Sequence, residues 1–257
     1  MNDREDVTRV FSKVPAATLG FWALKLIATT VGEIGGNLLS MNLALGYLEA
    51  TLILFAVFFA FTALQLSARN FHPSLYWATI VASTTAGTTL ADFADRSLGI
   101  GYTGGSLLLF GLVIASLLAW KLDAGRLSSD VIVSRRIELH YWLTITFSQT
   151  LGTALGDWFA DTAGLGYGGS TIVFTLGLAV VAALYLYRAA SPVLLFWAAF
   201  ILTRPFGAVF GNLFDKPVAS GGYGINRFLL VGMLICVLAI GLMVIPQRAK
   251  RASAQSA

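Results

Sequence analysis

Four long stretches with almost no charged residues limit this chain to folds that place most side chains in an apolar environment. Residues 107–120, 172–187 and 228–246 carry no charge, and residues 44–66 carry only Glu49. These lengths approach the roughly 20 residues that an α-helix needs to cross a hydrocarbon core about 30 Å thick. Charged residues make up 12% of the chain, about half of the roughly 25% that is typical of soluble domains. The sequence therefore predicts an integral membrane protein.

Hydropathy predicts eight transmembrane helices, of which the odd-numbered ones are more polar than the even-numbered ones. The expected ranges are 18–38, 45–67, 74–95, 104–121, 139–160, 168–188, 192–213 and 226–246. The two tails and the loops on their side hold 12 of the 17 Lys and Arg residues, whereas the loops on the other side hold three. The positive-inside rule then places both termini in the cytoplasm. The net charge of +4 thus follows from topology, and we expect no nucleic-acid partner.

A two-helix unit recurs four times along the chain in one register. The copies open on Trp22, Trp77, Trp142 and Trp197. In every copy a glycine follows ten residues later, a second small residue 14 residues later, and an asparagine or aspartate 15 residues later. Because each unit crosses the membrane twice, all units point the same way, and parallel repeats imply an axis along the membrane normal. We expect an all-α, pseudo-fourfold or pseudo-twofold bundle with the odd helices inside and the apolar even helices outside.

The repeats divide the chain into two halves, joined by a longer connection. The expected segments are a cytoplasmic tail at 1–17, repeats at 18–67 and 74–121, a cytoplasmic linker at 122–138, repeats at 139–188 and 192–246, and a cytoplasmic tail at 247–257. This arrangement indicates that a two-helix unit has doubled twice.

One face of each odd helix carries small residues at helical spacing. Most of these small residues are glycines, namely Gly32, Gly36, Gly87, Gly152, Gly156, Gly207 and Gly211. Stripes of this kind let helix backbones approach closely in lipid, so we assign the glycines to helix packing. The same face carries polar residues at one equivalent position of the four repeats, and therefore at one depth along the bundle axis. We call this set the polar level; it consists of Thr29, Thr84, Gln149 and Arg204. Lipid cannot satisfy these groups, so we expect them to face other helices or water.

Carboxylates gather in the outer half of the odd helices. Asp92 and Asp157 take equivalent places in two repeats, where the other two repeats have Asn37 and Asn212, and Glu33 lies close by in sequence. A charge at the bilayer centre costs about 2.5–3.5 kcal/mol even on the lenient insertion scale, so these groups need a proton, a basic partner, water or a cation. Hard oxygen donors suit Mg²⁺, Mn²⁺ or Ca²⁺. We expect a divalent cation at Asp92 and Asp157, with a polar clasp between helices as the alternative.

Other charged residues have positions typical of the membrane interface. We expect Asp95, Asp161 and Asp215 to be hydrated at the ends of the odd helices. Lys25 lies early enough in its helix for the side chain to extend to the cytoplasmic surface. Arg204, which precedes a proline, either neutralises an aspartate or holds an anionic substrate.

The glycine-rich runs GIGYTGGS (99–106) and GLGYGGS (164–170) do not follow a strand, and no lysine follows them, which argues against nucleotide binding. We expect tight outward-facing turns that let Tyr102 and Tyr167 anchor at the interface. The single cysteine, Cys236, lies in an apolar run and allows neither an internal disulfide nor a thiolate metal site.

These observations favour a transporter or channel for a small cation, and Mn²⁺ or Mg²⁺ is the favoured ion. Such a protein would bind the cation with the repeated Asp and Asn residues, Glu33 and the polar level. A transporter for a small organic solute or anion, using Arg204, is the alternative, as is a non-transport role in sensing or assembly. We expect no enzyme, because the chain has no His-Glu-x-x-His motif, no paired glutamates at metal-ligand spacing and no Ser or Cys nucleophile beside a base. The expected partners are the lipid bilayer and a small cation or solute, with no cofactor beyond a divalent cation. The oligomeric state stays open, a homo-oligomer included.

The four copies are most alike in the stretches KLIATTVGEIGGN, TTAGTTLADFADRSLGIGYTGGS, QTLGTALGDWFADTAGLGYGGS and TRPFGAVFGNLFDKP. In these stretches the chain resembles a bacterial family of integral membrane proteins built from a membrane repeat of unknown function, and the resemblance covers residues 15–245. It implies an eight-span protein of the bacterial inner membrane, and it assigns no activity and no site residues.

Overall fold

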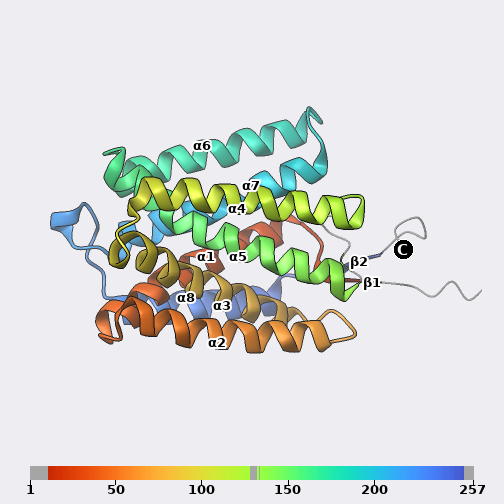
Figure 1. The fold of residues 1–257 in the computed structure, drawn as a ribbon, viewed down its shortest axis with the longest axis horizontal. Helices are drawn as coiled ribbons and strands as arrows, with labels where there is room; N and C mark the ends of the chain where they lie inside the picture. The colour runs from red at the N-terminus through yellow and green to blue at the C-terminus, as the bar shows by residue number, and fades with distance from the viewer. Residues whose placement is uncertain (1–10, 128–131, 133, 252–257) are drawn as a thin grey trace, which may run out of the picture.

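Residues 11–127, 132 and 134–251 are described by the computed structural model, and they form a helical bundle with one short two-stranded ribbon (Figure 1). The helices are α1 (Leu19–Asn37), α2 (Gly46–Ser67), α3 (Pro73–Asp92), α4 (Gly101–Ala124), α5 (Arg135–Asp157), α6 (Gly166–Leu186), α7 (Pro192–Asp215) and α8 (Arg227–Val244). The expected all-α class is thus confirmed apart from the ribbon. Parts of the expected tails (1–10 and 252–257) and of the expected linker (128–131 and 133) lie outside the described residues.

All four helices of the inner layer begin where the sequence supplies a cap or a proline. The Thr18 side chain accepts a hydrogen bond from the backbone N–H of Phe21 and starts α1, and Ser134 caps α5 in the same way. Pro73 and Pro192 occupy first positions of α3 and α7, where a missing N–H loses no helical bond. At the other end, five-residue π-helical segments continue α1, α3 and α5; these are Leu38–Asn42, Phe93–Ser97 and Trp158–Thr162. The α7–α8 connection instead contains a short 3₁₀ turn, Val218–Ser220.

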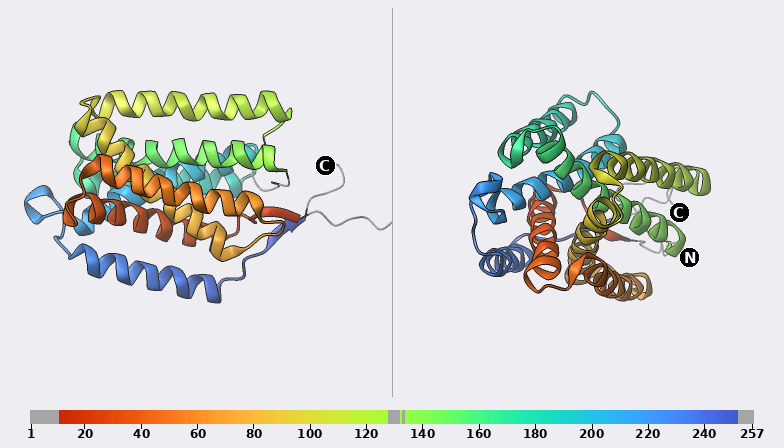
Figure 2. Two further views of the ribbon diagram at one scale, coloured as in Figure 1. Left: turned by 60° about the horizontal axis from the view of Figure 1, so that its bottom comes forward. Right: turned by 60° about the vertical axis from the view of Figure 1, so that its left-hand side comes forward.

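The odd-numbered helices form the inner layer of the bundle. α1 packs against α3, α3 against α5, α5 against α7, and α7 against α1. Each even-numbered helix lies outside and packs on the odd helix of the next repeat: α2 on α3, α4 on α5, α6 on α7 and α8 on α1 (Figure 2). Because α8 returns to α1, the four repeats close into a ring. Each repeat therefore relies on its neighbour to cover its inner helix.

The first glycines of each glycine-rich run make the sharp turns that lead from the inner layer to the outer layer. Gly99 and Gly101 have φ of 72°, and Gly164 and Gly166 have φ of 71° and 63°, values that glycine adopts without strain. In the first repeat the position equivalent to Gly99 is Ala44, with φ of 53°. The second half of each run is already helical, since α4 and α6 begin at Gly101 and Gly166. The helices thus begin two to three residues before the expected starts at 104 and 168.

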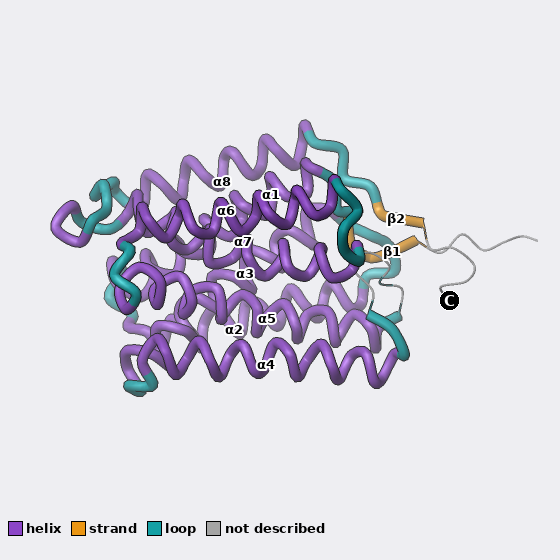
Figure 3. Tube along the Cα trace, turned by 90° about the horizontal axis from the view of Figure 1, so that it is seen from above, coloured by secondary structure: helices purple, strands orange, loops and turns teal. Residues whose placement is uncertain are grey.

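The terminal segments join in a structure that the sequence did not indicate. β1 (Phe11–Pro15) pairs antiparallel with β2 (Ala249–Arg251) at one end of the bundle (Figure 3). The Lys13 ammonium lies 2.5 Å from the Glu138 carboxylate of α5, and both side chains are nearly inaccessible to solvent. The segments expected as cytoplasmic tails, 1–17 and 247–257, contain these two strands, because α1 and α8 pack together and bring the segments that flank them side by side.

Within the described residues, five helices are long and apolar enough to cross a membrane: α2, α4, α6, α7 and α8. The outer helices expose many large apolar side chains, among them Phe59, Leu107, Ile172 and Met233. Soluble monomers rarely expose a contiguous apolar surface of this extent, so the bundle has the surface of a membrane protein. The polar side chains of α1, α3 and α5 are largely buried in the inner layer.

Candidate functional site

The glycines of the repeats bring the four inner helices into backbone contact. Each first glycine faces the polar level of the next helix around the ring, and the pairs are Gly32 with Thr84, Gly87 with Gln149, Gly152 with Arg204, and Gly207 with Thr29. A Cβ atom added to Gly152 would lie 2.6 Å from Cβ of Arg204, which is too close for a real contact. The second glycines pack in the same way: Gly36 on Thr88, Gly156 on Ala208, and Gly211 on Ile34. An added Cβ atom would crowd the neighbouring helix at these positions, most severely at Gly32, Gly152 and Gly207.

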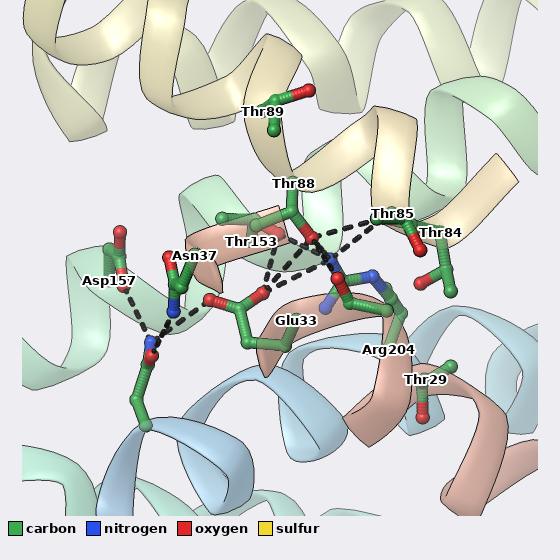
Figure 4. Close-up of polar contacts among 12 residues, drawn as sticks. Thr29, Glu33, Asn37, Thr84, Thr85, Thr88, Thr89, Thr153, Asp157 and Arg204 are labelled. Atoms are coloured by element: carbon green, nitrogen blue, oxygen red, sulfur yellow. Dashed lines mark hydrogen bonds and ion pairs between the residues drawn. The ribbon is translucent and has the colours of Figure 1, made fainter. Parts of the chain in front are cut away.

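A buried ion pair occupies the middle of the ring (Figure 4). Arg204 of α7 and Glu33 of α1 are 0% and 1% exposed, and Arg204 Nη2 lies 3.2 Å from Glu33 Oε2. Nη2 also donates to the hydroxyls of Thr88 on α3 and Thr153 on α5, at 2.7 and 2.5 Å. These hydroxyls lie 3.3 and 3.1 Å from Glu33 Oε2, to which they donate. All four repeats thus supply one side chain to a single polar cluster.

The repeated Asn and Asp residues lie together on the next level toward the π-helical ends. Asn212 Nδ2 donates to Glu33 Oε1 at 3.1 Å and lies 3.4 Å from Asp157 Oδ1. Asn37 Nδ2 donates to Asn212 Oδ1 at 3.0 Å. Asp92 completes the level, and these Asn and Asp residues are only 1–2% exposed. The structure therefore brings the predicted oxygen donors of all four repeats to one buried level.

Arg96 joins the two aspartates for which a cation was predicted. Its Nε lies 3.0 Å from Asp92 Oδ1 and its Nη2 lies 2.9 Å from Asp157 Oδ2, while 28% of its side chain stays accessible to solvent. From sequence, Arg96 lies one residue beyond the expected helix at 74–95 and is one of the three basic residues of the loops on the outer side. Its place four residues after Asp92 was the available signal, because residues at that spacing face each other on a helical turn. Tyr102, which we expect to anchor at the interface, lies in the first turn of α4, with its ring centroid 5.7 Å from the Arg96 guanidinium.

The outermost carboxylates differ from the hydrated groups that we expected. Asp161 is exposed, but Asp95 and Asp215 are each 6% exposed. Asp215 Oδ2 accepts a hydrogen bond of 2.6 Å from Arg227 Nε of α8. Asp95 packs against the α4 backbone at Gly105, because its π-helical segment contacts α4. The expectation of hydration is thus wrong for Asp95 and Asp215.

Lys25 does not reach the surface, contrary to expectation. Its side chain is 0% exposed, and Nζ lies 3.8 Å from the centroid of the Phe200 ring. The packing of α7 and α8 on α1 buries this position, so the side chain points into the bundle instead of along the helix to the interface. Nζ has no hydrogen-bond partner among the described residues, and neither do the Thr84 hydroxyl and the Gln149 amide.

Aromatic side chains close the end of the ring that lies near the ribbon. Trp77, Trp142 and Trp197 are at most 3% exposed and belong to one continuous apolar cluster. Within this cluster the hydroxyls of Tyr76 and Tyr141 form a hydrogen bond of 2.6 Å. At the opposite end Arg96 and Arg227, which contact the buried carboxylates, are partly accessible to solvent.

Within the part of the chain that the structure describes, no group of three or more His, Cys, Asp and Glu side chains could hold a metal ion. A cation at the Asn and Asp level would be held by two carboxylates, with amide oxygens and water to complete its shell. Mg²⁺ commonly has such a shell, with one or two carboxylates and several waters.

A family model described as Repeat of Unknown Function (DUF347) matches residues 20–71, 75–125 and 140–191, more than half of the chain. The chain belongs to the DUF347 repeat family. The resemblance inferred from sequence is thereby confirmed. The three matched segments of this DUF347 protein are the repeats whose inner helix ends in a π-helical segment, whereas α7 has no such continuation in the described residues. No curated protein and no solved structure matches this DUF347 protein.

Proposed function

We propose that this DUF347 protein crosses a bacterial inner membrane eight times as a pseudo-fourfold ring, with both termini in the cytoplasm. The eight helices have 18 to 24 residues, which at 1.5 Å per residue corresponds to about 27–36 Å. The β1–β2 ribbon and the most basic connections share one end of the bundle, as the positive-inside rule requires of the cytoplasmic side.

The polar composition of α1, α3 and α5 is compatible with crossing the bilayer. Several of their threonine hydroxyls donate to the carbonyl one turn earlier, as Thr30 does to Leu26 and Thr85 does to Val81. A hydroxyl satisfied within its own helix needs no water. The remaining polar groups lie inside the ring, where lipid does not reach them.

Within this ring, transport of a small cation, Mn²⁺ or Mg²⁺, is the function that the geometry supports best. The observation that carries the proposal is the buried level to which each of the four repeats contributes an Asp or Asn side chain. The two carboxylates of this level, Asp92 and Asp157, share the single guanidinium of Arg96. With both carboxylates ionised, Asp92, Asp157 and Arg96 together carry a net charge of −1. A divalent cation and Arg96 can therefore neutralise the same carboxylates in turn.

Arg96 suits this exchange because it comes from the solvent side of the level. Its side chain is 28% exposed, whereas those of the two aspartates are 2–3% exposed. It belongs to the π-helical segment Phe93–Ser97, and such segments are frequent at functional sites. In the proposed cycle Arg96 withdraws when a cation enters and returns when the cation leaves, while the aromatic cluster closes the other end.

The direct test is flux of Mn²⁺ into liposomes that contain the purified protein and a Mn²⁺-quenched dye. We expect Asp92→Asn combined with Asp157→Asn to abolish the flux. The matched control is Asp161→Asn, which removes an exposed carboxylate from the same end and should leave the flux unchanged. Absence of flux for the wild-type protein under every imposed gradient, or equal flux for the double variant, would refute cation transport.

Topology is tested separately with single cysteines in a Cys236→Ser background. Ser220→Cys lies at the end with Arg96, and Ser67→Cys lies at the end with the ribbon. In intact cells a membrane-impermeant maleimide should label the cysteine at position 220 only, and position 67 should react after permeabilisation. Labelling of both positions in intact cells would contradict the proposed arrangement.

A further inference from the structure

We propose that the ring holds a second site, for one small monovalent anion, between Lys25 and Arg204 on the cytoplasmic side of the Glu33 pair. The anion belongs to the class of chloride, nitrate or formate. This proposal goes beyond cation transport and does not depend on it. It rests on charged and polar side chains that are fully buried and lack partners.

The four side chains that form this site are each 0% exposed: Lys25, Arg204, Thr84 and Gln149. Their unpartnered atoms are Lys25 Nζ, Arg204 Nε and Nη1, the Thr84 hydroxyl and both polar atoms of the Gln149 amide. Nearly all buried polar groups in proteins have a hydrogen-bond partner. Most of the unpartnered atoms here are N–H or O–H donors, so the missing partner is an acceptor.

Packing places these four side chains at adjoining levels of one ring. Lys25 Nζ lies 3.8 Å above the Phe200 ring, and Arg204 follows Phe200 by one turn on the same face of α7. Arg204 Nη2 lies 3.5 Å from the Thr84 carbonyl of α3. The Arg204 stem packs on Gly152, which follows Gln149 by one turn of α5. The two cations are therefore neighbours, with the hydroxyl and the amide at the level of Arg204.

The charge of the interior indicates the charge of the ligand. Between the tryptophan level and the Asn and Asp level, α1, α3, α5 and α7 carry only Lys25, Arg204 and Glu33 as ionisable residues. Glu33 neutralises one of the two cations and contacts Nη2 of Arg204, not Nε or Nη1. With Lys25 protonated a single positive charge remains, and an unpaired charge in a buried site is strongly unfavourable. One monovalent anion neutralises it and accepts from the free donors.

The surroundings of Lys25 restrict the anion to a small one. The positions equivalent to Lys25 in the other repeats are Ile80, Ile145 and Phe200, each 0% exposed. These three positions carry apolar side chains, which offer no polar contact to a larger organic acid. A halide, nitrate or formate ion needs only the donors that the site supplies.

The test is saturable binding of radiolabelled chloride to the detergent-purified full chain, in sodium gluconate at constant ionic strength. We expect one site per chain, with unlabelled nitrate and formate in separate competition arms to distinguish a halide from a carboxylate. Chloride at 100 times its Kd should raise the ratio of folded to unfolded protein about 100-fold and the melting temperature by about 5–11 °C. Absence of saturable binding to the wild-type protein overturns the proposal.

Lys25→Met removes the charge but keeps an unbranched chain of similar length, and it should abolish both binding and the chloride-dependent shift in melting temperature. The matched control is Ile80→Met, which places methionine at the equivalent position of α3 and should leave chloride binding intact. Should Lys25→Met fail to fold, Gln149→Leu supplies a second variant, for which we expect at least a tenfold weaker affinity. Unchanged binding to either site variant contradicts the proposal. Asp92→Asn with Asp157→Asn should retain chloride binding, which separates this site from the proposed cation site.

Discussion

The Glu33–Arg204 pair is the contact whose removal should affect this protein most. Replacing Arg204 with methionine leaves the Glu33 carboxylate, which is 1% exposed, with hydrogen bonds from Thr88, Thr153 and Asn212 but without a cation in contact with it. Removal of one partner of a buried ion pair typically costs about 3–5 kcal/mol. For a chain of this length each kcal/mol shifts the melting temperature by about 2–4 °C. Arg204→Met should therefore lower the melting temperature of the detergent-purified protein by about 6–20 °C.

Combining Arg204→Met with Glu33→Gln tests the electrostatic origin of this loss. The double variant removes both charges, and the introduced amide keeps an oxygen for the neighbouring donors. Because replacing both partners of a buried pair is often close to neutral, we expect the double variant to recover at least half of the loss. The comparison is a double-mutant cycle, which isolates the pairwise energy.

The solvent-exposed pair between Arg136 and Asp123 provides the control for this experiment. Arg136 has 74% of its side chain accessible, and exposed pairs contribute about 0–1 kcal/mol. Arg136→Met should thus change the melting temperature by at most about 4 °C. The reasoning is refuted if Arg204→Met lowers stability no more than Arg136→Met does, or if the two changes in the buried pair are simply additive.

Three further predictions follow from single contacts. Gly152→Ala should destabilise the protein by about 1–3 kcal/mol through overpacking. At the control position Gly111 an added Cβ would meet no heavy atom within 4 Å, so Gly111→Ala should be neutral or slightly stabilising. Thermal melts of both variants check this prediction. Arg96→Gln should tighten Mn²⁺ binding at least tenfold in equilibrium dialysis, since it removes the cation that competes for the carboxylates; weaker binding would contradict the exchange. Tyr76→Phe should lower the free energy of unfolding by about 1 kcal/mol, because the buried Tyr141 hydroxyl loses its partner; no measurable change would show that this bond contributes nothing.

The helical class, the repeats and the approximate helix ranges followed from the sequence because their signals are local. Uncharged runs of membrane-spanning length reveal helices whatever their neighbours are, and Trp22 and its three counterparts recur with a fixed spacing to a glycine. The polar faces of the odd helices could be read from helical periodicity alone. These are properties of one segment at a time.

The polar contacts were less predictable because they depend on which helices meet. The repeat register indicated that Asn37, Asp92, Asp157 and Asn212 share a level, but not that Arg96 joins the two aspartates. Thr88 and Thr153 drew no attention in sequence, since threonine is abundant in these helices. Their role comes from the place that Glu33 takes beside them in the closed ring.

Lys25 shows most clearly where sequence reasoning ends. Its position near a helix end is equally compatible with a side chain that reaches the interface and with one that points inward. The sequence by itself determined that a charge stands at this point of α1 and that the facing residues in the other repeats are apolar. Only the tertiary structure decided its environment, because α8 returns to cover α1 and α7 places Phe200 and Arg204 beside it. The local sequence pattern determines which residues lie on a given face of a helix, whereas the closure of the ring determines which residues of the neighbouring helices they contact.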